Sequence, residues 1–191
     1  MFNKKPSRES LLDAQFAFLF DPAPANEYVC IECETSTLAL ETAEVQAIHL
    51  VLIRDNRILS SQKLSLFVKS SAHPMEDNPD YLEPLDAVRQ LLYYIGSRPV
   101  LGYYLDFDLN LLNQQIEQLL GFALPNEQIE VSGIYYNKRQ SKSQPINVDL
   151  RFDTIVRKLD LPILGNANNA LTHVITTALM YIKLQHLVKV D

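Results

Sequence analysis

Apolar residues gather first in three stretches typical of strands. These stretches cover residues 28–33, 45–53 and 58–68, and each is rich in β-branched and other apolar side chains. Asp55 and Asn56 stand between the last two and are typical of a tight hairpin turn. The pattern therefore predicts an antiparallel meander.

Helical spacing of apolar residues dominates the remainder of the chain. It predicts helices over residues 85–95 and 107–120, ended by Gly96 and Gly121, and further helices over 148–161 and from about 170 to Val188. A short buried strand is expected at 99–102, and loops are expected at 70–81 and 137–147 because both segments are polar. Strands followed by alternating strands and helices indicate an α/β fold with a mixed sheet.

The amino-terminal region has a different pattern of apolar and polar residues. Residues 7–20 predict a short amphipathic helix that begins at Ser7, and two prolines within residues 21–27 then end the pattern. We therefore expect a helix and linker over residues 1–26 and one domain over residues 27–191. If this helix carried the function, the chain would be a protein-binding scaffold.

Composition limits the classes of function. The chain has 191 residues, is 47% hydrophobic and carries a formal net charge of −6, which suits one domain core and argues against a general affinity for phosphate backbones. No apolar stretch is long enough to span a membrane and no signal peptide is apparent, so we expect a cytoplasmic protein without membrane attachment. Cys30 and Cys33 should point to opposite faces of a strand, which argues against a disulfide or a zinc site.

Three short segments carry candidate chemistry. Glu32 and Glu34 share one face at the end of the first strand, where two carboxylates could hold a divalent ion or could simply face solvent. Asp106 and Asp108 begin a helix after Gly102, where they could be site residues or ordinary helix-start carboxylates. His173 follows Asn168 by five residues at the start of the last helix, where a histidine could equally be a surface or core residue.

In order, these segments resemble the three motifs of the DEDDh 3′-to-5′ exonucleases, a family that includes polymerase proofreading subunits, RNase T and oligoribonuclease. The resemblance covers residues 28 to about 184. The first motif matches Glu32-Cys33-Glu34-Thr35-Ser36-Thr37-Leu38, the second matches residues 102–108, and the third matches residues 168–174. The resemblance implies an RNase H-like mixed five-stranded sheet, an antiparallel meander followed by parallel strands, flanked by helices.

Carried over to this chain, the resemblance implies Mg²⁺ or Mn²⁺ as cofactor if the domain is active, and no cofactor if it is not. The implied metal ligands are Glu32, Glu34, Asp108 and His173, while Asn168 occupies the position of the general base. Three of these five positions depart from the family. Glu32 is one methylene longer than the usual Asp, His173 is a poor ligand for Mg²⁺, and Asn168 cannot accept a proton.

We therefore expect catalysis to be lost or strongly reduced, although His173 could act as a displaced base. The resemblance assigns substrate binding to Thr35, Leu38, Tyr103 and Tyr104, where the two tyrosines could stack on a base or line the core. His49 stands where the family usually has glycine. The expected partner is a single-stranded nucleic-acid 3′ end or a nucleotide. The alternative is a non-catalytic module that binds nucleotides, nucleic acid or protein, and a protein partner and a homodimer stay open.

Overall fold

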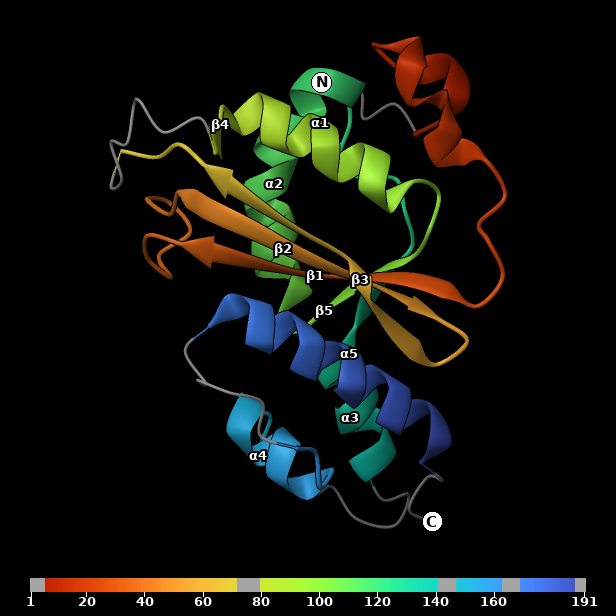
Figure 1. Ribbon diagram of the computed structural model, residues 1–191, viewed down its shortest axis with the longest axis vertical. Coiled ribbons are helices and arrows are strands. Elements are labelled where there is room, and N and C mark those ends of the chain that lie inside the picture. Colours follow the sequence, from red (N-terminus) through yellow and green to blue (C-terminus); the bar gives the residue numbers. More distant parts are fainter. Residues whose placement is uncertain (1–5, 72–79, 141–146, 163–168, 188–191) are drawn as a thin grey trace.

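A six-stranded mixed sheet forms the centre of the molecule. The computed structural model describes residues 6–71, 80–140, 147–162 and 169–187, and orders the strands β4-β3-β2-β1-β5-β6 (Figure 1). The meander pairs antiparallel, and the remaining strands run parallel to their neighbours. The strands are β1 (Glu27–Thr35), β2 (Val45–Arg54), β3 (Arg57–Val68), β4 (Tyr81–Leu82), β5 (Val100–Gly102) and β6 (Gln128–Glu130).

The predicted meander and mixed sheet are confirmed, with one more strand than expected. Asp55 and Asn56 form the hairpin turn with φ of 49° and 61°, the left-handed conformation that a two-residue hairpin needs. The sequence pattern located four strands and missed both β6, which has three residues, and β4, which begins at the last residue of the segment expected to be a loop. Two residues are too few to give a sequence pattern, so only the pairing of Phe67 with Tyr81 reveals this strand.

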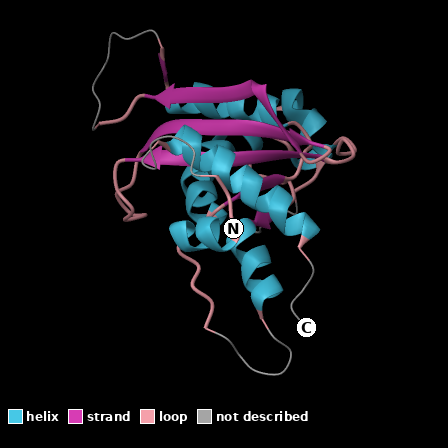
Figure 2. Ribbon diagram, turned by 60° about the horizontal axis from the view of Figure 1, so that its bottom comes forward, coloured by secondary structure: helices cyan, strands magenta, loops and turns pink. Residues whose placement is uncertain are grey.

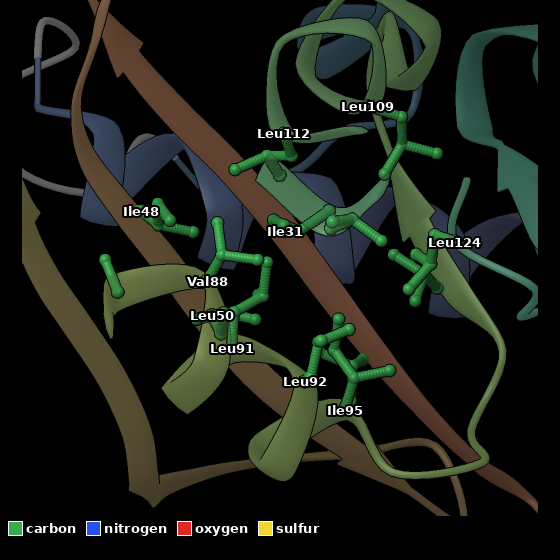
Figure 3. Packing of buried hydrophobic residues seen from close by; sticks show 14 of the residues in the cluster. Ile31, Ile48, Leu50, Val88, Leu91, Leu92, Ile95, Leu109, Leu112 and Leu124 are labelled. Atoms are coloured by element: carbon green, nitrogen blue, oxygen red, sulfur yellow. The ribbon is translucent and has the colours of Figure 1, made fainter. Parts of the chain in front are cut away.

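Helices cover both faces of the sheet, as Figures 1 and 2 show. On one face lie α1 (Pro84–Ile95) and α2 (Leu105–Leu120), and on the other lie α3 (Val131–Arg139), α4 (Phe152–Lys158) and α5 (Ala170–His186). Because side chains alternate along a strand, Ile31 packs towards α1 and α2, while Cys30 packs towards α5. Figure 3 shows the first of these cores, with Ile48 and Leu50 facing Val88 and Leu91.

Helix ends follow local chemistry. Gly96 and Gly121 end α1 and α2 with positive φ, as predicted. The helix expected over 148–161 is shorter, because the Asp149 carboxylate accepts hydrogen bonds from the Arg151 backbone N–H and the Thr154 hydroxyl and keeps the preceding residues out of the helix.

The predicted amino-terminal helix is instead two 3₁₀ helices, η1 (Arg8–Ser10) and η2 (Ala14–Phe20). Between them the Leu12 backbone N–H donates to the Leu120 carbonyl at 3.0 Å, which ties the segment to the end of α2. Phe16 and Leu19 are buried in the same core as α1 and α2. None of the helices in the described ranges is long and apolar enough to cross a membrane.

Candidate functional site

The first-motif carboxylates lie on the sheet face that α5 partly covers. Cys30, Glu32 and Glu34 alternate onto this face of β1, and the Cys30 thiol lies 3.4 Å from the Val174 carbonyl of α5. Because α5 begins at Ala170, Glu32 lies near the start of this helix. Burial raises the pKa of both the Cys30 and Cys33 thiols, and their side chains enter different cores, as the spacing predicted.

Glu32 faces His173. The Nδ1 atom of His173 lies 3.8 Å from Oε1 of Glu32, and the imidazole stacks on the Phe152 ring with centroids 4.4 Å apart and planes 8° apart. Burial raises the pKa of Glu32, and the neighbouring His173 opposes that shift. The second carboxylate oxygen of Glu32 is buried without a hydrogen-bond partner among the described residues. Phe152 therefore holds the imidazole against one side of a largely desolvated carboxylate.

Glu34 faces a second histidine, His49 of β2. Cross-strand register aligns Glu32, His49 and Ser65 in one row, so all three side chains share a face. His49 Nδ1 lies 2.9 Å from the Ser65 hydroxyl, and Nε2 lies 3.4 Å from Oε1 of Glu34, a long and electrostatic contact. Burial lowers the pKa of His49, and Glu34 opposes this shift. The residue that departs from the family's glycine thus fills the space beside Glu34.

Asp108 joins the site from α2. Strand β5 pairs with β1 only through Val29 and Cys30, so the edge of β1 is open at Cys33. Asp108 is buried there, and burial raises its pKa well above the usual range. The charge of Glu32 adds to this rise, while a hydrogen bond from the Cys33 backbone opposes it. Asp106, the other carboxylate of this helical turn, is exposed.

Glu130 is a site-supporting residue that the sequence motifs do not indicate. Its carboxylate accepts hydrogen bonds from the backbone N–H groups of Tyr104 at 3.1 Å and Leu105 at 2.7 Å, at the beginning of α2. It also accepts from the backbone and hydroxyl of Ser132 at the beginning of α3. One side chain therefore caps two helices. Its 26-residue separation from Tyr104 explains why no local sequence pattern shows the contact.

We predict that Glu130→Ala lowers the free energy of unfolding by about 2 kcal/mol, because the first turns of both helices lose a charged acceptor. Urea denaturation followed by circular dichroism measures this loss. Asn169→Ala is the matched control, since Asn169 caps only α5 through the Thr172 N–H, and its loss should be about 1 kcal/mol. Equal losses in the two variants would contradict the double cap.

The predicted substrate-binding residues divide into two groups. Tyr103 is half-buried, donates to the Leu150 carbonyl and packs edge-on against Phe152, which matches the core-lining alternative. Tyr104 has φ of 53° and is 55% exposed. Its ring is the accessible member of the pair and contacts that of Tyr103 at 4.6 Å.

Thr35 is the last residue of β1, and Leu38 lies in the segment that follows it. The Thr35 hydroxyl donates to the Thr37 carbonyl, and Leu38 is 84% exposed. Asn168 lies outside the described residues. The cavity of about 760 Å³ between the sheet, α1 and α2 is lined by Ile48, Val88 and Leu112 and lies on the opposite face of the sheet from Glu32 and Glu34.

The donor set around Glu32 does not fit a pair of hard divalent ions as it is folded. Glu32 and Glu34 each face an imidazole, and no three His, Cys, Asp or Glu side chains in the described ranges are arranged to hold a metal ion. Mg²⁺ prefers a nearly octahedral shell of oxygens, which the two histidines interrupt. The structure therefore brings Glu32, Asp108 and His173 together and turns Glu34 towards His49.

Comparison with known proteins identifies the fold. No protein-family model matches the chain, and no curated protein sequence matches it significantly. The structure is similar to a product-bound exonuclease I, with a TM-score of 0.65, 10% identity, and coverage of 85% of this chain and 44% of that one.

Two structures of Escherichia coli exonuclease I agree. The complex with a dT13 oligonucleotide has a TM-score of 0.67, 11% identity, and coverage of 84% and 41%. The zinc-bound form with single-stranded DNA has a TM-score of 0.66, 11% identity, and coverage of 84% and 40%. The chain therefore spans less than half the length of these proteins. It has the RNase H-like α/β fold found in exonuclease I, as the motifs predicted.

Proposed function

We propose that this chain is an exonuclease-fold domain that binds the 3′ end of single-stranded nucleic acid, with hydrolysis lost or strongly reduced. The observation that carries the proposal is that a histidine faces each of the two first-motif carboxylates, His173 beside Glu32 and His49 beside Glu34. In a two-metal hydrolysis these carboxylates must bind the ions that generate and stabilise charge. Here an imidazole lies beside each of them, 3.4 Å from Glu34 and 3.8 Å from Glu32.

The surroundings of Asp108 support the same conclusion. Asp108 and Glu32 are both desolvated, and burial raises the pKa of each. His173 stands where the resemblance expects a fourth carboxylate, so the site carries fewer acidic ligands and repels an approaching phosphate less.

Binding is assigned to the exposed aromatic and cationic groups around the carboxylates. Tyr104 offers an accessible ring on which a terminal base can stack. Arg151 lies between Leu150, which binds the Tyr103 hydroxyl, and Phe152, which stacks on His173. Its side chain is 81% exposed, so we assign it a phosphate contact that competes with its ion pair to Asp149. The similar structures of exonuclease I contain single-stranded oligonucleotides, which favours this class of ligand.

The test measures binding and cleavage separately. We expect fluorescein-labelled dT12 to bind in EDTA and to stay intact when Mg²⁺ or Mn²⁺ is added. Tyr104→Ala should weaken binding about 5- to 100-fold, because base stacking on an aromatic ring contributes about 1–3 kcal/mol. Fluorescence anisotropy measures the affinity, a denaturing gel measures strand length, and a circular oligonucleotide of equal length reports dependence on the 3′ end.

Glu34→Ala is the control for residual catalysis. Calorimetric titration of Mn²⁺ into the native protein and this variant reports whether the carboxylate holds an ion. Saturable binding that the variant loses, together with strand shortening from the 3′ end, would show a working nuclease and refute the loss of hydrolysis. If dT12 binds neither in EDTA nor with Mg²⁺ or Mn²⁺, the proposed binding function is refuted.

A further inference from the structure

A second aromatic surface lies on the same sheet face as the carboxylates. Alternation along β3 places Ser65 and Phe67 on the face of His49, and pairing with β4 places Tyr81 beside Phe67. The Phe67 and Tyr81 rings lie 5.7 Å apart with planes inclined by 39°. Phe67 is 41% exposed, a large exposure for an aromatic side chain in a strand.

This part of the face lies past the start of α5. The helix runs back along β1 from Val174, opposite Cys30, to Tyr181, whose ring lies 5.1 Å from that of Tyr28. Phe67 pairs with Ala47, which is the partner of Glu34, towards the other end of β1. The two rings therefore lie beyond the carboxylates, on the part of this sheet face that the start of α5 does not reach.

The aromatic surface is continuous with the candidate site. The His49 ring meets the Phe67 ring edge-on at 6.4 Å, and the same His49 faces Glu34. On the other side of β1, His173 faces Glu32, and Phe152 and Tyr103 connect it to Tyr104 through ring contacts. Rings thus extend from both sides of the two carboxylates.

We propose that Phe67 and Tyr81 form a second stacking platform for single-stranded nucleic acid, separate from Tyr104. This inference rests on the proposed function and extends it from a terminal nucleotide to a longer strand. Phe67 and Tyr81 lie on β3 and β4, whereas Tyr104 follows β5, so three strand spacings separate β3 from β5 and four separate β4 from β5. At about 4.8 Å per spacing these are about 14 Å and about 19 Å, or about four to six stacked nucleotides at about 3.4 Å each.

The chemistry around the rings favours a nucleic acid over a protein surface. On this face Phe67 lies across from Ala47 and beside Tyr81, and the polar side chains of Ser65 and His49 border the two rings. A protein-docking patch usually presents contiguous apolar area, whereas isolated rings among polar groups suit bases that stack on a ring and keep their edges in water. Because ring stacking does not depend on base edges, we expect weak sequence preference.

The experiment compares a short and a long oligonucleotide. In EDTA, Phe67→Ala should weaken dT12 binding about 5- to 100-fold and leave dT3 binding unchanged, because dT3 cannot reach from Tyr104 to β3. Tyr104→Ala should weaken both. Phe67→Tyr should retain dT12 affinity and Phe67→Leu should not, since leucine is apolar but has no ring. Tyr93→Ala on α1, at the opposite face of the sheet, is the control, and circular dichroism verifies that each variant is folded.

Each outcome decides the proposal. Three results would overturn it: unchanged dT12 affinity in Phe67→Ala, an equal loss of dT3 and dT12 affinity in that variant, or full dT12 affinity in Phe67→Leu. The proposed function would still stand in each case if Tyr104→Ala weakens dT3 binding. A shift from dimer to monomer in sedimentation with unchanged oligonucleotide affinity would assign the surface to a second copy of the chain. Absence of binding by the native protein to both probes would refute the proposed function itself.

Discussion

Phe16→Ala is expected to lower the free energy of unfolding by about 3–4 kcal/mol. Phe16 is completely buried in the core that α1 and α2 share with the sheet, and its ring lies 5.7 Å from that of Tyr93. Removing a buried phenylalanine ring loses its transfer free energy and leaves a cavity. Urea denaturation followed by circular dichroism gives the unfolding free energy.

The control for Phe16 is Leu12→Ala in the same segment. Leu12 is 70% exposed, so its truncation should cost less than about 1 kcal/mol. A small effect of Phe16→Ala would mean that the amino-terminal segment is a detachable element, which is what a scaffold function for this region requires. A large effect makes residues 14–20 part of the domain, and deletion of residues 1–26 would then destabilise the whole protein.

Glu27→Ala is expected to lower the free energy of unfolding by about 2–3 kcal/mol at neutral pH. The Glu27 side chain is only 11% exposed and accepts hydrogen bonds at 2.6 Å from both Arg54 and Arg98. Loss of one member of a buried ionic network leaves the other charges unpaired, which typically costs about 3–5 kcal/mol. We expect a loss below this range because Arg54 is about half exposed, so water solvates its charge once Glu27 is removed.

The effect of Glu27 should depend on pH. Burial raises the pKa of Glu27, but the hydrogen bonds and charges of Arg98 and Arg54 outweigh burial and hold the pKa below its ordinary value of 4.5. A lowered folded-state pKa stabilises the protein above the unfolded-state pKa. The difference between the native protein and Glu27→Ala should therefore be full at neutral pH and shrink as pH falls below about 4.5.

Asp21→Ala separates this network from an ordinary ion pair. Asp21 contacts Arg8 at the same 2.6 Å, but both side chains are about half exposed. Exposed pairs contribute about 0–1 kcal/mol, so this variant should change stability little at any pH. A Glu27→Ala effect as small as that of Asp21→Ala would show that the buried network is not a stabilising element.

Glu27 and its partner Arg98 connect the fold to the site. Glu27 begins β1, which carries Glu32 and Glu34 near its other end, and Arg98 precedes β5, which leads to Tyr104. The network therefore ties β1 to the segment entering β5 at the end opposite the carboxylates. Loss of Glu27 should reduce oligonucleotide affinity only in proportion to unfolding, because no atom of Glu27 lies in the candidate site.

The sequence by itself determined the features that depend on short-range regularity. Alternation placed Glu32 and Glu34 on one face and the two cysteines on opposite faces, helical spacing located α1, α2 and α5, and Gly96 and Gly121 set two helix ends. Only the tertiary structure decided the partners of those residues. The contact of Glu34 with His49 depends on strand register, the Glu130 cap joins positions 26 residues apart, and Phe16 packs into a core formed by elements distant in the sequence. The physical reason is that periodicity reports which face of an element is buried, whereas contacts between elements depend on register, distance and the packing of the whole domain.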